Sequence, residues 1–237
     1  MEKKWKTRVF RWFIPIKMSL KDFLTYQAKT SPNPLGLEVS RAKGSYIFDS
    51  NGKKYLDFVA GISACSLGHR HPEIIRAIKK QLNKFLHVMV YGEYVQEPSV
   101  NLCKKLASLL PKKLEVTFLT NSGTEAIEGA MKLAKRCTKK SSFIAAKNSY
   151  HGSTQGALSL LGVRNQKKGY GPLLPKVNFI DFNSIEDLIK IDDNTAAVIL
   201  ETIQGGAGFI IPKPDYLKSV KRRCEEVGAL LILDEIQ

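Results

Sequence analysis

The sequence predicts an α/β fold, with a mainly parallel sheet covered by helices on both faces and a small antiparallel arm before it. From about residue 115 onward, short apolar runs alternate with helical patterns. Such alternation is typical of parallel sheets whose crossover helices cover both faces. Nearer the N-terminus, an Asn-Gly pair lies between two short apolar runs. This pair is a strong signal for a tight hairpin.

The antiparallel arm is predicted between residues 18 and 60. Its two runs, Tyr46 to Asp49 and Lys54 to Phe58, flank a turn that contains Asn51 and Gly52. Both turn residues tolerate positive φ, so the two runs are expected to pair as antiparallel strands. The rest of this region has an irregular, β-like pattern.

Two helices are expected after the arm. Pro72 suits a first helical turn, and apolar residues recur behind it at helical spacing, namely Ile74, Ile75, Ile78, Leu82 and Phe85. The next helix follows Pro98 and ends at Pro111, with the apolar positions Cys103, Leu106, Ala107 and Leu110.

The alternating region then predicts strands at residues 116–119, 143–146, 177–180, 196–200 and 229–233. Helices are expected between them, at residues 123–137, 153–161, 184–189 and 217–227. Gly228 is expected to end the last of these helices, because glycine readily adopts the left-handed conformation of a helix C-terminus.

The formal net charge of +15 would suit a nucleic-acid-binding protein. However, Lys and Arg are spread along the chain without interleaved aromatic residues or a recognisable motif, which favours a lysine-rich solvated surface and no nucleic-acid partner. The basic leader, residues 1–17, is interpreted as a disordered extension or an upstream start before Met18. The alternative is a membrane-surface or import segment, and no run is long enough for a membrane span.

The four cysteines are widely spaced and form no Cys-x-x-Cys pair, which argues against a zinc site or a redox motif. Cys103, Cys137 and Cys224 occupy apolar positions of helical patterns, so we expect buried thiols and a reducing, cytoplasmic location. His69 and His71 lie close together without further ligands, which is weak support for a metal.

Polar residues follow the ends of several predicted strands, at Asn121 to Thr124, Tyr150, Glu201 and Asp234. In open α/β sheets, ligands bind beyond the carboxyl ends of the strands. We therefore expect these residues to converge on one edge of the sheet and to form a binding site.

Each of these residues also has a purely structural interpretation. Ser122, Gly123 and Thr124 open a helix whose free N–H groups suit a phosphate, or they form an ordinary N-cap. Asp234 could pair with a protonated pyridine nitrogen, or cap the next turn. Tyr150 could stack on a flat heteroaromatic ring, or be a half-buried core tyrosine.

Taken together, the motifs resemble those of class III pyridoxal-phosphate-dependent aminotransferases of the acetylornithine and ornithine type. The matching stretches occur in the family's order: Leu67 to His69, Thr120 to Ala126, Tyr150 to Gly152, Glu201 with Gln204-Gly205, and Leu231 to Gln237. The resemblance covers the chain from about Leu20 to its end. It implies a type I fold for pyridoxal-phosphate enzymes, a homodimer, and amine or amino-acid and keto-acid substrates.

The resemblance also implies roles for individual residues. Pyridoxal 5'-phosphate would be held by Ser122, Gly123 and Thr124 at its phosphate. Tyr150 would stack on its ring, Asp234 would pair with the ring nitrogen, and Gln237 would approach the ring hydroxyl. Glu201 and Ser153 would lie on the substrate side. The leader (1–17) would precede an arm (18–60) that is part of a small domain and a large cofactor-binding domain (61–237).

The chain departs from the family pattern at three points. Ser153 replaces the arginine of acetylornithine enzymes, and Gly206 replaces a glutamate that is common in dual-substrate members. No lysine occupies the context of the family's Schiff-base lysine, Lys147 being the least unsuitable substitute. We therefore expect a truncated transaminase sequence. The alternatives are an inactive or split-gene fragment that at most binds cofactor or a partner, and a basic nucleic-acid-binding protein.

Overall fold

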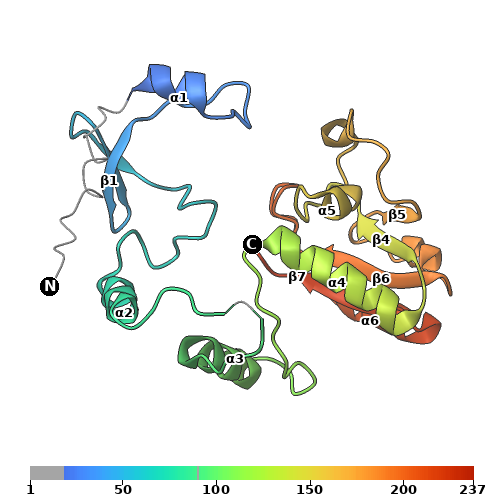
Figure 1. The fold of residues 1–237 in the computed structure, drawn as a ribbon. Helices are drawn as coiled ribbons and strands as arrows, with labels where there is room; N and C mark the ends of the chain where they lie inside the picture. Colours follow the sequence, from blue (N-terminus) through green and yellow to red (C-terminus); the bar gives the residue numbers. More distant parts are fainter. Residues whose placement is uncertain (1–18, 90) are drawn as a thin grey trace, which may run out of the picture. The chain divides into compact units, whose positions relative to one another are not determined.

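The computed structural model describes residues 19–89 and 91–237. The leader lies outside the described residues, so its interpretation stays a prediction. The chain divides into two compact units, which we call the N-terminal unit (Met1–Tyr91) and the C-terminal unit (Gly92–Gln237). Figure 1 shows the elements of both units.

The N-terminal unit contains the predicted hairpin. Its antiparallel sheet has the order β1 (Val39–Lys43), β2 (Tyr46–Asp49) and β3 (Lys54–Leu56). The turn between β2 and β3 is held by Asp49, whose Oδ1 accepts hydrogen bonds of 2.9 Å from the N–H groups of Asn51 and Lys53. Gly52 has a φ of 83°, which explains the preference for glycine at this position. The hairpin prediction is confirmed.

Two helices flank this sheet in the sequence. Helix α2 (Pro72–Leu82) begins at the predicted proline. Helix α1 (Leu20–Tyr26) was not predicted, because a seven-residue helix offers too few turns for a clear period. The side chain of Ser19 caps it by accepting from the N–H of Asp22.

The C-terminal unit contains the parallel sheet. Its strands β4 (Ser142–Ala146), β5 (Val177–Ile180), β6 (Thr195–Glu201) and β7 (Leu230–Asp234) are parallel, in the order β5-β4-β6-β7. The remaining elements of this unit are α3 (Glu97–Leu109), α4 (Gly123–Thr138), α5 (Gln155–Ser159), α6 (Tyr216–Val227) and the 3-10 turns η1 (Arg164–Lys167) and η2 (Glu186–Lys190). The predicted fold class is confirmed.

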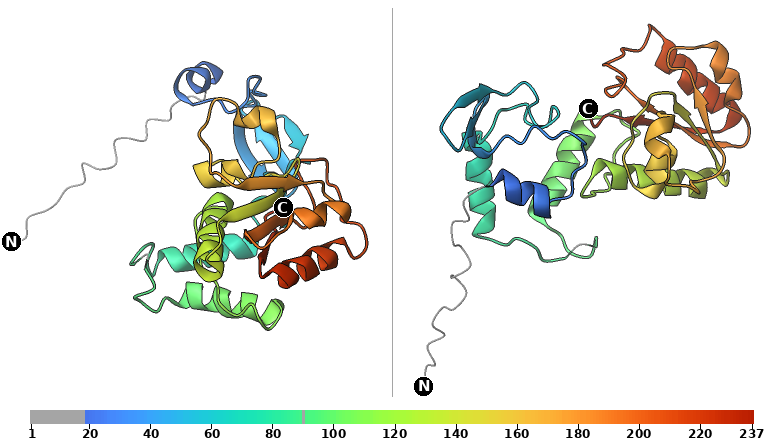
Figure 2. Two further views of the ribbon diagram at one scale, coloured as in Figure 1. Left: turned by 90° about the vertical axis from the view of Figure 1, so that its right-hand side faces the viewer. Right: turned by 90° about the horizontal axis from the view of Figure 1, so that it is seen from above.

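Helices α4 and α6 cover opposite faces of this sheet (Figure 1 and the right-hand view of Figure 2). Alternate residues of β4 point to the two faces, so that Phe143 and Ala145 pack against α4, whereas Ile144 and Ala146 pack on the side of α6. All five residues of β4 and all seven of β6 are buried. Such continuous burial explains why these strands are apolar throughout instead of alternating.

Two sequence-based predictions in this unit were wrong, and a third was confirmed only in part. Residues 116–119 form no strand, since no described strand lies beside them to complete a ladder, and Val116 is 95% exposed. The helix predicted at residues 184–189 is present only as the short 3-10 turn η2 (Glu186–Lys190). Cys137 is exposed, because the buried stripe of α4 runs from Ile127 through Met131 and Ala134 toward Thr138.

The other predicted buried thiols differ from each other. Cys224 is buried in α6, and this burial raises the pKa of its thiol to about 12. Cys103 is only half-buried. Gly228 ends α6 with a φ of 65°, as predicted.

Candidate functional site

A cavity of about 270 Å³ lies where the carboxyl end of β7 meets the first turn of α4. It is lined by Gly123, Thr124, Tyr150, His151, Gly152, Ser153, Asp234 and Ile236. The predicted site residues Gly123, Thr124, Tyr150, Ser153 and Asp234 therefore come together, although more than 100 positions separate the first from the last. The other three, Ser122, Glu201 and Gln237, lie outside this lining.

The first turn of α4 is held by two side chains. Ser122 is the N-cap, and its hydroxyl accepts a hydrogen bond of 3.3 Å from the N–H of Glu125. The carboxylate of Glu125 in turn accepts one of 2.8 Å from the N–H of Asn121. These contacts leave the N–H groups of Gly123 and Thr124 without helical carbonyl partners, as at every helix start. The capping interpretation of Ser122 is thus realised, and it leaves main-chain donors available to an anion.

The loop that carries Tyr150 and Ser153 is fastened to α4. The hydroxyls of Thr124 and Thr154 lie 2.8 Å apart. One carboxylate oxygen of Glu128 accepts hydrogen bonds from the Thr154 hydroxyl at 2.6 Å and from the N–H groups of Gly156 at 2.9 Å and Ala157 at 3.1 Å. This single side chain therefore caps α5 and fixes the position of the loop.

Gly152 permits the close approach of this loop to α4. Its φ is 121°, and a Cβ at this position would lie against the Thr124 hydroxyl and 2.5 Å from the Thr124 Cβ. A larger residue would push the loop away from the helix. Steric exclusion of a Cβ thus explains why the Tyr-His-Gly triplet has glycine at its third position.

Asp234 is held by a histidine that the sequence analysis did not single out as functional. The Nδ1 of His151 lies 2.8 Å from Oδ2 of Asp234, and both side chains are buried. The other ring nitrogen, Nε2, is buried and has no hydrogen-bond partner among the described residues. The available signal was the position of His151 beside Tyr150, but only the fold brings it to the end of β7.

Glu201 lies beside Asp234 at the end of β6, since the two residues are register partners in the parallel ladder. The side chain of Glu201 is buried, and its Oε2 has no hydrogen-bond partner within the described chain. Burial raises the pKa of this carboxyl, while His151 and the backbone N–H group of Tyr150 act in the opposite direction. Glu201 thus lies next to Asp234, which lines the cavity.

The raised pKa of Glu201 predicts a pH-dependent effect on stability. The folded protein holds this proton more tightly than the unfolded chain, so the free energy of unfolding falls as the pH rises from the ordinary glutamate pKa of 4.5 through the raised pKa of Glu201. We expect Glu201→Gln to increase the free energy of unfolding at pH 7, and this gain to shrink as the pH approaches 4.5. Urea unfolding at several pH values measures the difference. A gain that is independent of pH would contradict this assignment.

Tyr150 and Gln237 border the same region. Tyr150 is 49% exposed, so one part of its side chain is accessible from the cavity. A Cβ on Gly206 would lie 3.8 Å from the Tyr150 Cβ, and one on Gly205 would lie 3.0 Å from Oε1 of Gln237. The two glycines therefore allow the loop after β6 to pass close to both side chains.

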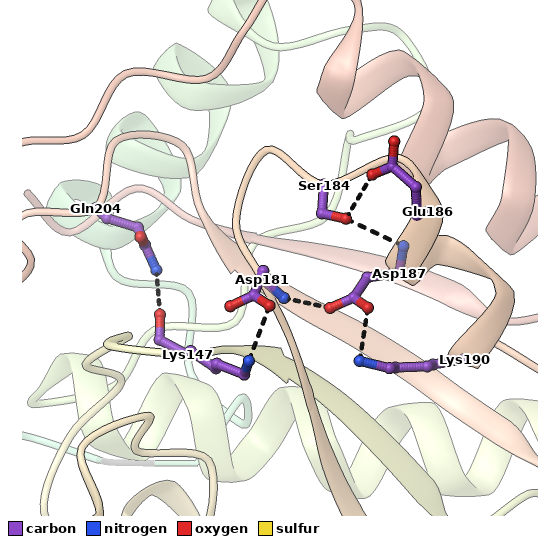
Figure 3. A network of polar contacts seen from close by, with 7 residues as sticks. All are labelled: Lys147, Asp181, Ser184, Glu186, Asp187, Lys190 and Gln204. Carbon is purple, nitrogen blue, oxygen red and sulfur yellow. Dashed lines mark hydrogen bonds and ion pairs between the residues drawn. The ribbon is translucent and has the colours of Figure 1, made fainter.

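Lys147 does not line this cavity, and its side chain points toward Asp181 (Figure 3). Its Nζ lies 2.8 Å from Asp181 Oδ2, and this contact raises the pKa of the ammonium group. The carbonyl of Lys147 accepts a hydrogen bond of 2.9 Å from the buried side chain of Gln204. A lysine that is kept charged by a carboxylate is a poor nucleophile.

Of the two histidines near residue 70, His69 pairs with a carboxylate. His69 Nε2 lies 2.6 Å from Asp57 Oδ2, and the described part of the chain contains no group of three or more potential metal ligands.

Within residues 19–89 and 91–237, none of the helices has both the length and the hydropathy that a membrane span requires.

Comparison with known proteins gives consistent matches. The family model described as Aminotransferase class-III matches residues 26–237. The chain is 43% identical over 206 residues to acetylornithine aminotransferase of Methanosarcina acetivorans, covering 85% of this chain and 50% of that protein. It is 40% identical over 203 residues to the [LysW]-aminoadipate semialdehyde/glutamate semialdehyde transaminase of Sulfolobus acidocaldarius, covering 85% of this chain and 52% of that protein.

Comparison with solved structures also finds aminotransferases. The adenosylmethionine-8-amino-7-oxononanoate aminotransferase of Methanocaldococcus jannaschii matches with a TM-score of 0.85 and 32% identity, over 92% of this chain and 54% of that one. An ornithine aminotransferase of Toxoplasma gondii with partial occupancy of pyridoxal phosphate at its active site matches with a TM-score of 0.80 and 31% identity, over 92% and 52%. The chain spans about half the length of the curated relatives it matches.

Proposed function

Because the chain belongs to the class III aminotransferase family, we propose that its cavity binds pyridoxal 5'-phosphate and serves the transfer of an amino group from an amine or amino acid to a keto acid. One observation carries this proposal: Thr124, Tyr150 and Asp234 line a single cavity next to the carboxyl end of β7. A phosphate-binding group, an aromatic face and a carboxylate are thereby available to one small ligand.

The first turn of α4 would hold the phosphate. The N–H groups of Gly123 and Thr124 are free of helical carbonyls, and the positive end of the helix dipole favours an anion there. The Ser122 and Thr124 hydroxyls would add donors, although each already takes part in a hydrogen bond. Most of the phosphate contacts would therefore come from the main chain.

The ring of the cofactor would lie between Tyr150 and the end of β7. Tyr150 has the exposure that stacking requires. Asp234 would face the ring nitrogen, and His151 holds this carboxylate in place from a fully buried position. A bound pyridoxal phosphate supplies an electron sink for bonds that break at the substrate carbon.

The residues of this chain would support that chemistry by position and charge. An ionised Asp234 favours a protonated ring nitrogen, which strengthens the electron sink. Gln237 would approach the ring hydroxyl from its place beside Gly205. Glu201 and Ser153 would shape the substrate side. Ser153 lines the cavity, and its hydroxyl cannot replace a bidentate arginine contact with a substrate carboxylate. The proposed substrate class is therefore the broad one of amines and amino acids.

The family further suggests a homodimer, with a small domain that includes residues 18–60 and a large domain from residue 61, and the free cysteines favour a cytoplasmic location. We propose this arrangement for the whole enzyme. It is tested by the molar mass of the assembly in solution, and a monomer that binds cofactor would contradict it.

No residue that lines the cavity is a lysine, and Lys147 is paired with Asp181. We therefore expect that borohydride reduction of the 237-residue chain with pyridoxal phosphate labels no single lysine stoichiometrically. Peptide mapping by mass spectrometry measures the labelling. The Lys147→Gln variant is expected to give the same low, dispersed pattern as the parent chain.

Stoichiometric labelling at one lysine would contradict this expectation and would identify a residue able to carry the cofactor. Dispersed labelling together with cofactor affinity would support the second candidate, a chain that binds cofactor without catalysing transfer by itself. The observation that favours this candidate is the absence of lysine from the lining of the cavity.

A further inference from the structure

A second and larger cavity, of about 590 Å³, lies in the C-terminal unit between the loop after β4, the turn η1 and the edge strand β5. Its lining includes Lys147, Asn148, Arg164, Asn165, Lys167 and Phe179. It shares no lining residue with the 270 Å³ cavity at Asp234. The second cavity is therefore separate from the proposed cofactor site.

The polar lining of this cavity is cationic. Lys147, Arg164 and Lys167 contribute positive charges, and none of the lining residues is acidic. Lys147 has a partner in Asp181 (Figure 3). Arg164 and Lys167, in contrast, form no ion pair with any described residue. Two neighbouring cations of the lining thus have no ion-pair partner of their own among the described residues.

The surroundings of Lys167 are unfavourable for its positive charge. Its Nζ lies 4.4 Å from the centroid of the Phe179 ring, a cation–π arrangement that partly replaces lost hydration. Burial and the charge of Arg164 together lower the pKa of its ammonium group. An anion in the cavity would relieve the repulsion between these two cations.

The walls of the cavity are preformed by backbone contacts. The N–H of Gly162 donates a hydrogen bond of 3.0 Å to the carbonyl of Ser149. A Cβ on Gly162 would collide with Asn148 N and would lie 2.5 Å from Ser149 N, so the two walls touch directly. The side chain of Gln204 holds the carbonyl of Lys147 from the other side. A ligand would therefore find the backbone of these walls already in place.

We propose that this cavity is a second anion site, which binds a phosphate dianion carried by inorganic phosphate or by a small organic phosphate. The Arg164 guanidinium offers a planar fork for two phosphate oxygens, and Lys167 offers a point charge for a third. The Asn148 and Asn165 amides add neutral donors, and Val163 and Val177 provide an apolar wall for an organic group.

The test is a titration of the isotope-labelled full chain, followed by backbone amide NMR at constant ionic strength. Inorganic phosphate and phenyl phosphate are the probes, and sodium chloride is the reference. We expect saturable shifts at Asn165 and Lys167. Tighter binding of phenyl phosphate would assign the site to organic phosphates, and equal binding would assign it to phosphate itself.

The Arg164→Gln/Lys167→Gln double variant is expected to bind roughly 100-fold more weakly, because each of the two charged contacts contributes about tenfold. Lys168→Gln, an exposed neighbour outside the lining, is the matched control and should change the affinity less than about twofold. Equal losses in both variants would show non-specific attraction and overturn the proposal. Shifts confined to Gly123 and Thr124 would also overturn it, while supporting the proposed cofactor site.

A second readout does not depend on the variants. In the parent chain, phosphate should raise the pKa of Lys167, measured from its side-chain NMR signals, because a dianion counteracts the effect of Arg164. A pKa of Lys167 that is unchanged at saturating phosphate would overturn the proposal even if the double variant failed to fold.

Discussion

Replacing Gly162 with alanine is expected to lower the free energy of unfolding by about 3 kcal/mol or more. The added Cβ would collide with Asn148 N and would lie 2.5 Å from both Ala146 O and Ser149 N. All three atoms belong to the backbone at the end of β4, so no side-chain rotation can relieve the overlap. The loop must move, although it is held by the hydrogen bond from Gly162 N to Ser149 O.

Urea unfolding followed by circular dichroism measures this loss, and Gly129→Ala is the matched control. Gly129 lies inside α4, and a Cβ there would meet only Phe118 carbon atoms at 3.7 Å and beyond, which is ordinary contact. Alanine is a better helix former than glycine, so this control should gain about 0.5–1 kcal/mol. Equal small effects at both positions would show that the loop after β4 is not packed as described.

Replacing Asp234 with asparagine is expected to weaken the binding of pyridoxine 5'-phosphate by roughly 10- to 100-fold, if the ring nitrogen meets this carboxylate. Asparagine has the same shape and keeps an oxygen for His151, which lies 2.8 Å from Oδ2 of Asp234. The change therefore removes the charge and leaves the packing intact. Pyridoxine phosphate has no aldehyde, so it does not react with the many surface lysines.

Isothermal titration calorimetry of the full chain measures this affinity, and Glu235→Gln is the control. Glu235 is the next carboxylate along the chain, but it is exposed and does not line the cavity. Its loss should change the affinity by less than about threefold, because exposed charges are well screened. Equal effects of the two substitutions would mean that only the general charge of this region matters, and they would remove Asp234 from the site.

Local sequence signals determined much of the fold. The Asn51-Gly52 turn needs only residues close in sequence, because Asp49 supplies the side-chain acceptor and Gly52 the positive φ. The start of α4 is equally local, since the side chains of Ser122 and Glu125 accept hydrogen bonds from backbone N–H groups only a few residues away. The apolar strands β4 and β6 were recognisable because both of their faces are covered.

Some features could not be predicted because they depend on residues far away in the sequence. The apolar pattern of residues 116–119 is that of a strand, yet a strand exists only where a neighbour completes its hydrogen bonds. Whether Cys137 is buried or exposed depends on which side of α4 faces the sheet, to within a few tens of degrees around the helix axis. The helical period of the sequence does not determine this direction to within one residue.

By itself, the sequence determined the class of fold and the order of the polar residues that follow the strands. The tertiary structure alone decided which of them meet. It placed Thr124, Tyr150 and Asp234 around one cavity, and it paired Lys147 with Asp181 outside that cavity. It also supplied His151 as the partner of Asp234, 83 residues away. The physical reason is that a buried carboxylate must find a donor in space, and periodicity along a chain carries no information about partners at such separations.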